Sequence, residues 1–282
     1  MYMSKYNPLV SIALTTYNGG QLIVEQIDSL LDQSYSNFEI VISDDGSDEG
    51  TVTILEEYAR SDPRIKWFKS PLERGYMNNT QNAISLCKGE IIFLCDQDDT
   101  WHKEKVALHV EAYKDLSVFW VYNRLVLTDK DNKKELGYLE DFLPDYYSPK
   151  RMKLLYLTWG SCIGGAMTSY RASILHKSMP IGKYAHGHDS WIQLAIFPKK
   201  GFFIDTVLQT YRQHGKNEVG WGKKMTAEEL IANEKKAISR NMLFLRSLPA
   251  NKNLTLWKRS LFLFVYYAKK MRAYFLNNLG TK

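Results

Sequence analysis

Residues 90–102 read Glu90-Ile91-Ile92-Phe93-Leu94-Cys95-Asp96-Gln97-Asp98-Asp99-Thr100-Trp101-His102. The apolar part of this stretch predicts a buried strand, and its three carboxylates fall where that strand should leave the sheet. Carboxylates crowded this closely repel one another unless a cation lies among them. A divalent cation shared with a substrate phosphate is the usual arrangement. The stretch therefore predicts chemistry on a phosphorylated ligand.

Strand-like and helical segments alternate around this stretch. We predict strands at residues 10–14, 38–42, 65–68 and 90–95, and helices at residues 21–33, 79–86, 102–113 and from 51 onward. This order implies an α/β fold, in which helices cover both faces of a mostly parallel sheet. The second half is less regular, and there we predict a hairpin from residues 118–127 and 133 onward, a helix at 188–197 and a last strand at 202–211.

Three polar loops follow the predicted strands. They are Tyr17-Asn18-Gly19-Gly20, Asp44-Asp45-Gly46-Ser47 and Asp96-Gln97-Asp98-Asp99. Each loop alone fits ordinary turn chemistry, because Asp, Asn and Gly are turn formers. In parallel sheets, however, ligands bind at the carboxyl ends of the strands. Three such loops on one rim therefore indicate a binding site.

The bulk composition is that of a globular protein. The 282 residues suggest one large domain, or one domain with an appendage, and the hydrophobic share of 45% is ordinary. No stretch reaches the roughly 18 apolar residues of a membrane span. The polar N-terminus lacks a signal-peptide core, so we expect a cytoplasmic protein. The widely spaced Cys87, Cys95 and Cys162 are expected to be reduced thiols.

Charge divides the chain into two parts. Residues 216–282 contain 14 Lys/Arg and 4 Glu, which leaves 23 basic and 27 acidic residues for residues 1–215. We therefore expect a mildly acidic domain at 1–215 and a basic, aromatic-rich helical region at 216–282. This asymmetry suggests an anionic surface as a partner.

The C-terminal region predicts an amphipathic helix. Lys258 and Lys269 are eleven residues apart, about three helical turns, as are Arg259 and Lys270, so each pair shares a face. The other residues are mostly apolar or aromatic, which suits an anionic membrane surface, here the inner face of the plasma membrane. The alternatives are packing on the first domain or on a second subunit, which leaves a homodimer open. Nucleic acid fits poorly, because the acidic first part would repel it.

With these residues in view, the chain resembles the family 2 glycosyltransferases, inverting enzymes of the GT-A fold. The matching segments are residues 10–19, 44–51 and 88–101, which occur in the family's order and spacing within a resemblance that covers about residues 8–215. The Asp-Gln-Asp-Asp-x-Trp form at 96–101, with Tyr211-Arg212-Gln213-His214-Gly215, is most similar to the bacterial rhamnosyltransferase-like branch. The departure at 211–214 from the Gln-x-x-Arg-Trp segment of processive relatives argues against a polymerase.

The resemblance implies a Rossmann-like GT-A domain and an activity. The enzyme would move a sugar, with inversion, from a UDP- or dTDP-linked donor to a glycan or lipid-diphosphate-linked acceptor in bacterial cell-surface polysaccharide synthesis. It also implies that the loop of Asp44 and Asp45 faces the nucleotide base. We prefer Asp45 as the carboxylate that accepts from a pyrimidine N3–H, because such a contact rejects bases without that donor. Thr15, Tyr17 and Asn18 would line the same pocket, with packing as the alternative for Tyr17.

The resemblance assigns the acid cluster to the donor diphosphate. Asp98 would bind Mg²⁺ or Mn²⁺, and Asp96 would lie toward the ribose or serve as a second metal ligand. His214 would bind the metal or contact the diphosphate, with a structural role as its alternative, and Arg212 is a candidate partner for a phosphate. Because Asp99 is a further adjacent carboxylate, it stays open which acids of the motif bind the metal. The alternative role of Asp99 is to cap the helix that begins near residue 102.

The resemblance also assigns residues around the donor sugar and the acceptor. Gly164 and Gly165 would border the donor sugar. Asp189 is the candidate general base, since a carboxylate can take the proton of an attacking hydroxyl; an N-cap role is the alternative. His188 and Trp191 would shape the acceptor pocket, with Trp191 stacking on a sugar face.

Two other classes of protein are alternatives to a glycosyltransferase. One is a non-catalytic nucleotide-sugar-binding partner in a membrane complex, against which the intact Asp96, Asp98 and Asp189 argue. The other is a nucleotidyltransferase. That class needs a basic, Gly-rich triphosphate loop near the first strand, and residues 15–20 contain no basic residue.

Overall fold

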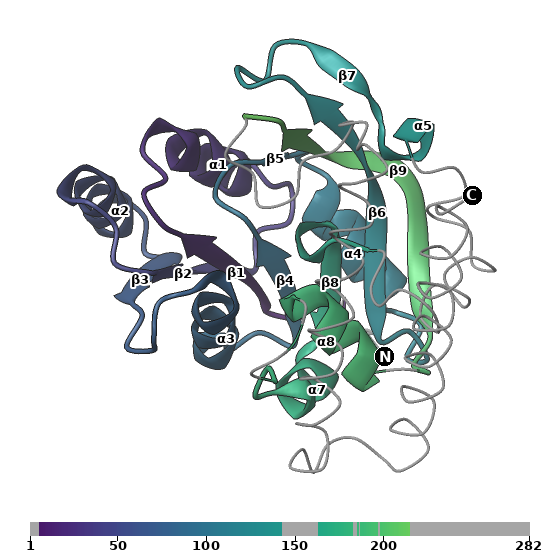
Figure 1. Ribbon diagram of the computed structural model, residues 1–282. Coiled ribbons are helices and arrows are strands. Elements are labelled where there is room, and N and C mark those ends of the chain that lie inside the picture. The colour runs from purple at the N-terminus through teal and green to yellow at the C-terminus, as the bar shows by residue number, and fades with distance from the viewer. Residues whose placement is uncertain (1–5, 143–162, 183–184, 186, 197, 215–282) are drawn as a thin grey trace, which may run out of the picture.

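The computed structural model describes residues 6–142, 163–182, 185, 187–196 and 198–214 (Figure 1). The strands are β1 (Val10–Thr16), β2 (Phe38–Asp44), β3 (Ile65–Lys69), β4 (Ile91–Cys95), β5 (Thr100–Trp101), β6 (Trp120–Thr128), β7 (Glu135–Tyr138), β8 (Thr168–Arg171) and β9 (Gly201–Arg212). The α-helices are α1 (Gln21–Leu31), α2 (Glu49–Ser61), α3 (Tyr76–Leu86), α4 (Lys105–Ala112), α5 (Leu139–Phe142), α7 (Ala172–Leu175) and α8 (His188–Ile196). Two 3₁₀ turns, η1 (Gly165–Met167) and η2 (His176–Ser178), flank β8 and α7.

These strands form one mixed sheet in the order β3-β2-β1-β4-β8-β6-β9-β5, with β7 beside β6. β1 runs parallel to β2 and β4, and β2 runs parallel to β3. β8 is antiparallel to β4 and β6, whereas β9 is parallel to β6. The arrangement confirms the predicted α/β fold. It also brings the carboxyl ends of β1, β2 and β4 to one edge of the sheet.

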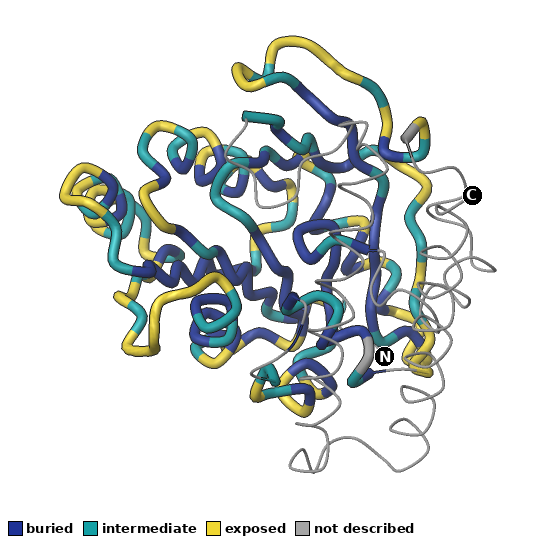
Figure 2. The backbone as a smooth tube through the Cα atoms, viewed as in Figure 1, coloured by how far each residue is buried: buried dark blue, intermediate teal, exposed yellow. Residues whose placement is uncertain are grey.

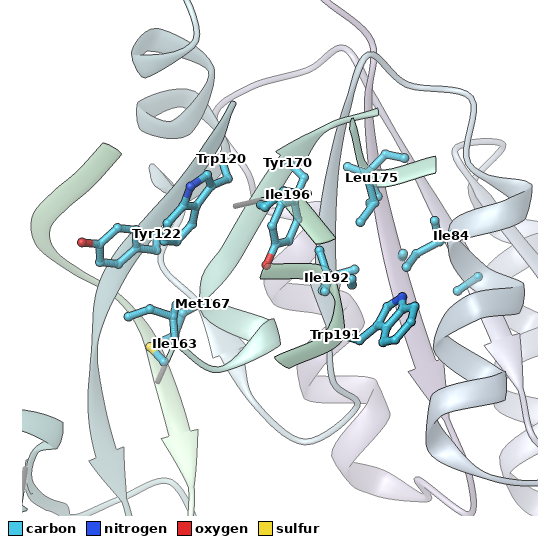
Figure 3. Packing of buried hydrophobic residues seen from close by; sticks show 14 of the residues in the cluster. Ile84, Trp120, Tyr122, Ile163, Met167, Tyr170, Leu175, Trp191, Ile192 and Ile196 are labelled. Atoms are coloured by element: carbon cyan, nitrogen blue, oxygen red, sulfur yellow. The ribbon is translucent and has the colours of Figure 1, made fainter. Parts of the chain in front are cut away.

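The strands β1, β2 and β4 are buried on both faces, which explains why their sequences are mostly apolar. Along β1 the side chains alternate between two core clusters: Ile12 and Leu14 belong to one, and Ala13 to the other. Figure 3 shows the cluster that contains Ala13, in which Trp120 and Tyr170 pack with residues of α8. Figure 2 shows the central strands buried and the outer surface of α2 exposed.

The predicted helices beside the first strands are confirmed. In α1, Ile23 and Ile27 are fully buried, as their spacing along one helical face predicts. In α2, the carboxylate of Asp48 accepts from the backbone N–H of Thr51 at 2.8 Å and caps the first turn. This cap ends the Asp44–Ser47 loop sharply, so the loop stays at the sheet edge.

The predicted helix at 102–113 begins later than expected, at Lys105. Thr100 and Trp101 pair with Thr210 and Gln209 as the short strand β5, which holds the chain extended after the acid cluster. The residue before the helix is Glu104. The alternative role of Asp99 as the cap of this helix is therefore wrong.

The remaining predictions divide by whether the structure describes the residues. The hairpin is confirmed, because β6 and β7 pair antiparallel. Cys87 and Cys95 are buried free thiols, while Cys162 lies outside the described residues. Of the helices in the described ranges, none combines the length and hydrophobicity of a membrane span. The basic region at 216–282 and the domain boundary before it also lie outside the described residues.

Candidate active site

Gln97 joins two of the three polar loops at the carboxyl edge of the sheet. Its side-chain Oε1 accepts from Thr16 Oγ1 at 2.7 Å and from the backbone N–H of Tyr17 at 3.0 Å. Its Nε2 donates to the carbonyl oxygen of Tyr17 at 3.2 Å. The middle residue of the Asp-Gln-Asp motif therefore fixes that motif to the end of β1. Sequence reasoning assigned Gln97 no role beyond its place in the motif.

Asn18 joins the first loop to the second. Its backbone N–H donates to Ser47 Oγ at 2.9 Å, and its side-chain Oδ1 accepts from the N–H of Asp48 at 2.8 Å. Asn18 has a φ of 49°, a left-handed conformation that Asn adopts more readily than most residues. The three predicted loops thus form one connected rim.

Asp44 and Asp45 have different surroundings, although they are neighbours. Asp44 is 1% exposed, and its carboxylate accepts from the N–H of Gly46 at 3.1 Å and from the N–H and hydroxyl of Ser47. Asp45 is 8% exposed, and its Oδ2 accepts from the N–H of Gly75 at 2.8 Å. Among the described residues, Asp45 Oδ1 has no hydrogen-bond partner. The geometry agrees with Asp45 as the carboxylate available to a ligand, while Asp44 shapes the turn.

Tyr17 lies at the surface of this rim. Its side chain is 45% exposed, and the guanidinium carbon of Arg74 lies 4.5 Å from its ring centroid. Thr15 is half-buried one residue before the end of β1. Tyr17 thus packs against Arg74 outside the core, and its role in lining a nucleotide pocket stays a prediction.

Asp96 and Asp98 lie half-buried in the loop after β4. Burial raises the pKa of Asp96 to about 6, and the charge of Asp98 acts in the same direction. The charge of Asp189 also raises this pKa, whereas His188 opposes the shift.

Asp99 is fixed beneath the motif. It is 1% exposed, and its Oδ2 accepts from Gln209 Nε2 at 2.6 Å. Gln209 Oε1 in turn accepts from Lys105 Nζ at 2.6 Å, and Lys105 also donates to the carbonyl oxygen of Ala166 at 2.8 Å. Burial raises the pKa of Asp99 well above its usual range and lowers that of Lys105 to about 7. This buried network ties the acid cluster to β9 and to the turn η1.

His214 and Asp98 are brought together by β9. His214 Nε2 lies 2.6 Å from Asp98 Oδ2, and the two side chains are 15% and 17% exposed. Carboxylates suit Mg²⁺ and Mn²⁺, and imidazole is a common metal ligand. No group of three His, Cys, Asp or Glu side chains among the described residues is arranged to hold a metal unaided. The residues present fit a cation whose remaining ligands are substrate phosphates and water.

Arg212 is a buried, ion-paired residue at the end of β9. Its side chain is 2% exposed, and Nη2 pairs with the carboxylate of Glu25 on α1. Sequence reasoning gave no signal for Glu25, since α1 and β9 are far apart in the chain. The role of Arg212 on a phosphate stays a prediction.

Asp189 lies in the first turn of α8, one residue after the helix begins at His188. Its Oδ1 accepts from the N–H of the next residue, Ser190, at 2.6 Å, so it does not cap the helix from outside. A Cβ added to Gly165 would lie 2.3 Å from His188 Nε2, which means that the imidazole is seated directly on this glycine. Gly164 precedes it in extended backbone (φ −60°, ψ 146°). The predicted Gly164–Gly165 and His188–Asp189 segments are thus adjacent.

Trp191 is not in the acceptor pocket. It is 2% exposed, belongs to the core cluster of Figure 3, and donates from Nε1 to the carbonyl oxygen of Ser178 at 2.7 Å. The expected stacking of its ring on a sugar is wrong, because the indole is buried on the inner side of α8. Its distance of two residues from Asp189 places it on a different side of the helix.

Comparisons with known proteins identify the family and the fold. A family-wide sequence model described as "Glycosyl transferase family 2" matches residues 11–178. The putative teichuronic acid biosynthesis glycosyltransferase TuaG of Bacillus subtilis is 30% identical over 129 residues, which are 46% of this chain and 51% of that protein. The chain spans about half the length of this curated relative, and less of several others.

Two solved structures share the fold at 16% sequence identity. Residues 1–349 of S. aureus TarS, in complex with UDP-GlcNAc, align with a TM-score of 0.60 over 93% of this chain and 72% of that one. A mannosyltransferase of Pyrobaculum calidifontis, in complex with GDP-Man and Mn²⁺, aligns with a TM-score of 0.58 over 98% of this chain and 80% of that one. At this identity the likeness supports the GT-A fold alone.

Proposed function

Because this chain belongs to glycosyl transferase family 2, we propose that it transfers one sugar, with inversion, from a UDP- or dTDP-linked donor to a glycan or lipid-linked glycan acceptor. A relative named for teichuronic acid biosynthesis supports a role in cell-surface polysaccharide synthesis. UDP-GlcNAc and GDP-Man in the two structures of the same fold support a nucleoside diphosphate sugar as donor.

The donor would bind along the connected rim of the three loops. Asp45, with one carboxylate oxygen that lacks a described partner, would accept from the base, while Tyr17 and Thr15 border the same pocket. An unpaired, nearly buried carboxylate oxygen is costly without a donor group, so the bound base would relieve that cost. Asp96 would lie toward the ribose.

Asp98 and His214, with Asp96 as a further ligand, would hold Mg²⁺ or Mn²⁺ beside the donor diphosphate. When bound, the cation would neutralise the charge that develops on the leaving nucleotide. Mn²⁺ in the mannosyltransferase structure supports this proposal. The network from Asp99 through Gln209 to Lys105 would keep the motif in place during turnover.

Asp189 would act as general base. In an inverting transfer, the acceptor hydroxyl attacks the anomeric carbon from the side opposite the leaving diphosphate, and its proton passes to a carboxylate as the new bond forms. The observation that carries the proposal is the buried network from Asp99 through Gln209 and Lys105 to the carbonyl oxygen of Ala166, because it joins the donor motif to η1, whose Gly165 contacts His188. His188, seated on Gly165, would border the same space.

The test is turnover with a donor found by thermal shift. Nucleotide sugars carrying uridine, thymidine and guanosine diphosphate are screened with Mg²⁺ and Mn²⁺, since a ligand that binds only the native state raises the melting temperature. Replacement of Asp189 by Asn should then lower the rate of nucleotide release at least about 100-fold, in the range expected for loss of a general base, and leave donor affinity within about threefold. Unchanged turnover would exclude Asp189 as the base.

A further inference from the structure

The burial of Trp191 leaves the acceptor side without its expected sugar-stacking ring, whereas Tyr76 is an exposed aromatic residue in ring contact with His188. Tyr76 is the first residue of α3, and its side chain is 43% exposed. The preceding residue, Gly75, donates its N–H to Asp45 Oδ2 at 2.8 Å. Tyr76 therefore stands at the edge of the proposed donor pocket, with a large apolar ring in contact with solvent.

The hydroxyl oxygen of Tyr76 also lies near Asp189, the candidate base. A Cβ built on Gly187 would lie 2.7 Å from Asp189 Oδ1 and 3.7 Å from the hydroxyl oxygen of Tyr76. The phenol and the carboxylate thus converge on one point above Gly187. This glycine keeps the space between them open, since any side chain there would clash with the carboxylate.

The ring of Tyr76 is oriented by its neighbour. Its centroid lies 6.0 Å from the imidazole centroid of His188, with the ring planes at 70°. That edge-to-face arrangement is a favoured geometry for two aromatic rings. His188 is itself seated on Gly165, so the chain Gly165–His188–Tyr76 fixes the ring relative to Asp189.

We propose that Tyr76 is the platform on which a pyranose ring of the acceptor packs while its hydroxyl faces Asp189. A pyranose presents a face of C–H groups, which bury apolar surface against an aromatic ring and meet the negative face of its π system. The ligand class is therefore a hexopyranoside with an unbroken C–H face, such as a β-glucoside or β-galactoside. The inference rests on the proposed function, because it names the acceptor-binding residue of the same site.

The test observes the Tyr76 ring itself. Tyrosines are replaced by 3-fluorotyrosine, and the ¹⁹F resonance of Tyr76 is identified by its loss in Tyr76→Phe. The protein is saturated with Mg²⁺ and whichever of UDP, dTDP or GDP binds in calorimetry, and methyl β-D-glucopyranoside or methyl β-D-galactopyranoside is added. The Tyr76 resonance should shift and saturate. That of Tyr138, which is 40% exposed on β7, should not.

Other results overturn the proposal. A Tyr76 resonance that stays in place, or moves no more than that of Tyr138, excludes a sugar platform. A shift that follows addition of the nucleotide sugar but not of the glycoside assigns Tyr76 to the donor instead. Failure of all three nucleotides to bind would count against the proposed function, whereas Tyr76 would still be tested by the glycosides alone.

Steady-state kinetics provide a second test of Tyr76, with an acceptor that supports turnover. Tyr76→Ala should raise the acceptor KM about tenfold, which corresponds to about 1.4 kcal/mol, and leave the donor KM within about twofold. Tyr76→Phe keeps the ring and should raise the acceptor KM much less than Tyr76→Ala does. A rise in the donor KM, or an equal loss in Tyr76→Phe, contradicts a platform for the acceptor.

Discussion

Nε2 of His214 lies 2.6 Å from Oδ2 of Asp98, although 116 residues separate them in the chain. The contact exists because β9 runs beside β6 and ends next to the loop that follows β4. The backbone N–H of Gln213 donates to the carbonyl oxygen of Thr128 at 2.9 Å, which holds the chain in place just before His214. The last described residue of the chain is thus part of the rim that the first three loops form.

This contact predicts that His214 contributes to metal affinity. We expect His214→Ala to weaken Mn²⁺ binding in the presence of a nucleoside diphosphate about 10- to 100-fold, as loss of a ligand or its close support does in metal sites. Calorimetry or electron paramagnetic resonance of Mn²⁺ measures the change. His176→Ala is the matched control, because His176 is exposed on η2. Equal affinity in both variants would remove His214 from the site.

The raised pKa of Asp96 predicts that metal binding depends on pH. The folded protein holds the pKa of this carboxyl at about 6, so below that pH a proton competes with the cation. Affinity should fall about tenfold for each pH unit below 6 and level off above it. Titrations with Mn²⁺ between pH 5 and 8 are made in the His214→Ala background, to exclude imidazole. If Asp96→Asn leaves the pH dependence unchanged, Asp96 is not a ligand and its place is toward the ribose.

The two adjacent acids of the second loop should respond differently to substitution. Asp44→Ala removes the acceptor for the N–H groups of Gly46 and Ser47, so the free energy of unfolding should fall by about 2 to 3 kcal/mol. Asp45→Asn should instead weaken nucleotide binding about tenfold with a smaller effect on stability. Chemical denaturation and calorimetry on the same samples distinguish these effects. A larger loss of stability in the Asp45 variant would reverse the assignment.

Trp191 should matter for stability and not for the acceptor. Trp191→Ala is expected to lower the free energy of unfolding by about 3 to 5 kcal/mol, the range for large aromatic side chains in cores. Trp191→Phe retains most of the packing and loses the hydrogen bond to Ser178, so about 1 kcal/mol is expected. Urea unfolding measures both. An unchanged stability in Trp191→Ala, together with a raised acceptor KM, would return Trp191 to the pocket.

The local patterns in the sequence predicted the first half of the fold well. Apolar runs ending in polar loops defined β1, β2 and β4, and the parallel order then placed Asn18, Asp45 and Asp98 on one rim. These elements are predictable because each depends on periodicity and turn chemistry within a few residues. The first two predicted strands end two residues too early, because the hydrogen-bonded pairing of β1 with β2 continues to Thr16 and Asp44.

Long-range contacts were not predictable in the same way. The pairing of Arg212 with Glu25 and the network of Asp99, Gln209 and Lys105 join segments more than a hundred residues apart, and no local pattern encodes them. The prediction for Trp191 was wrong for a related reason. The local sequence around an aromatic residue near a site motif does not show whether its side chain faces the pocket or the core. Only the packing of α8 against the sheet decides between the two.

We propose that a cation at Asp98 holds the donor diphosphate, and nucleotide binding tests this role of Asp98 directly. Calorimetric titrations of UDP, dTDP and GDP are made with and without Mn²⁺, in the unmodified protein and in Asp98→Ala. At least one nucleotide should bind at least about tenfold more strongly with Mn²⁺ than without it, and Asp98→Ala should lose this dependence while it keeps its melting temperature. Binding of equal strength with and without Mn²⁺ in both proteins would exclude a cation at Asp98 as the holder of the diphosphate.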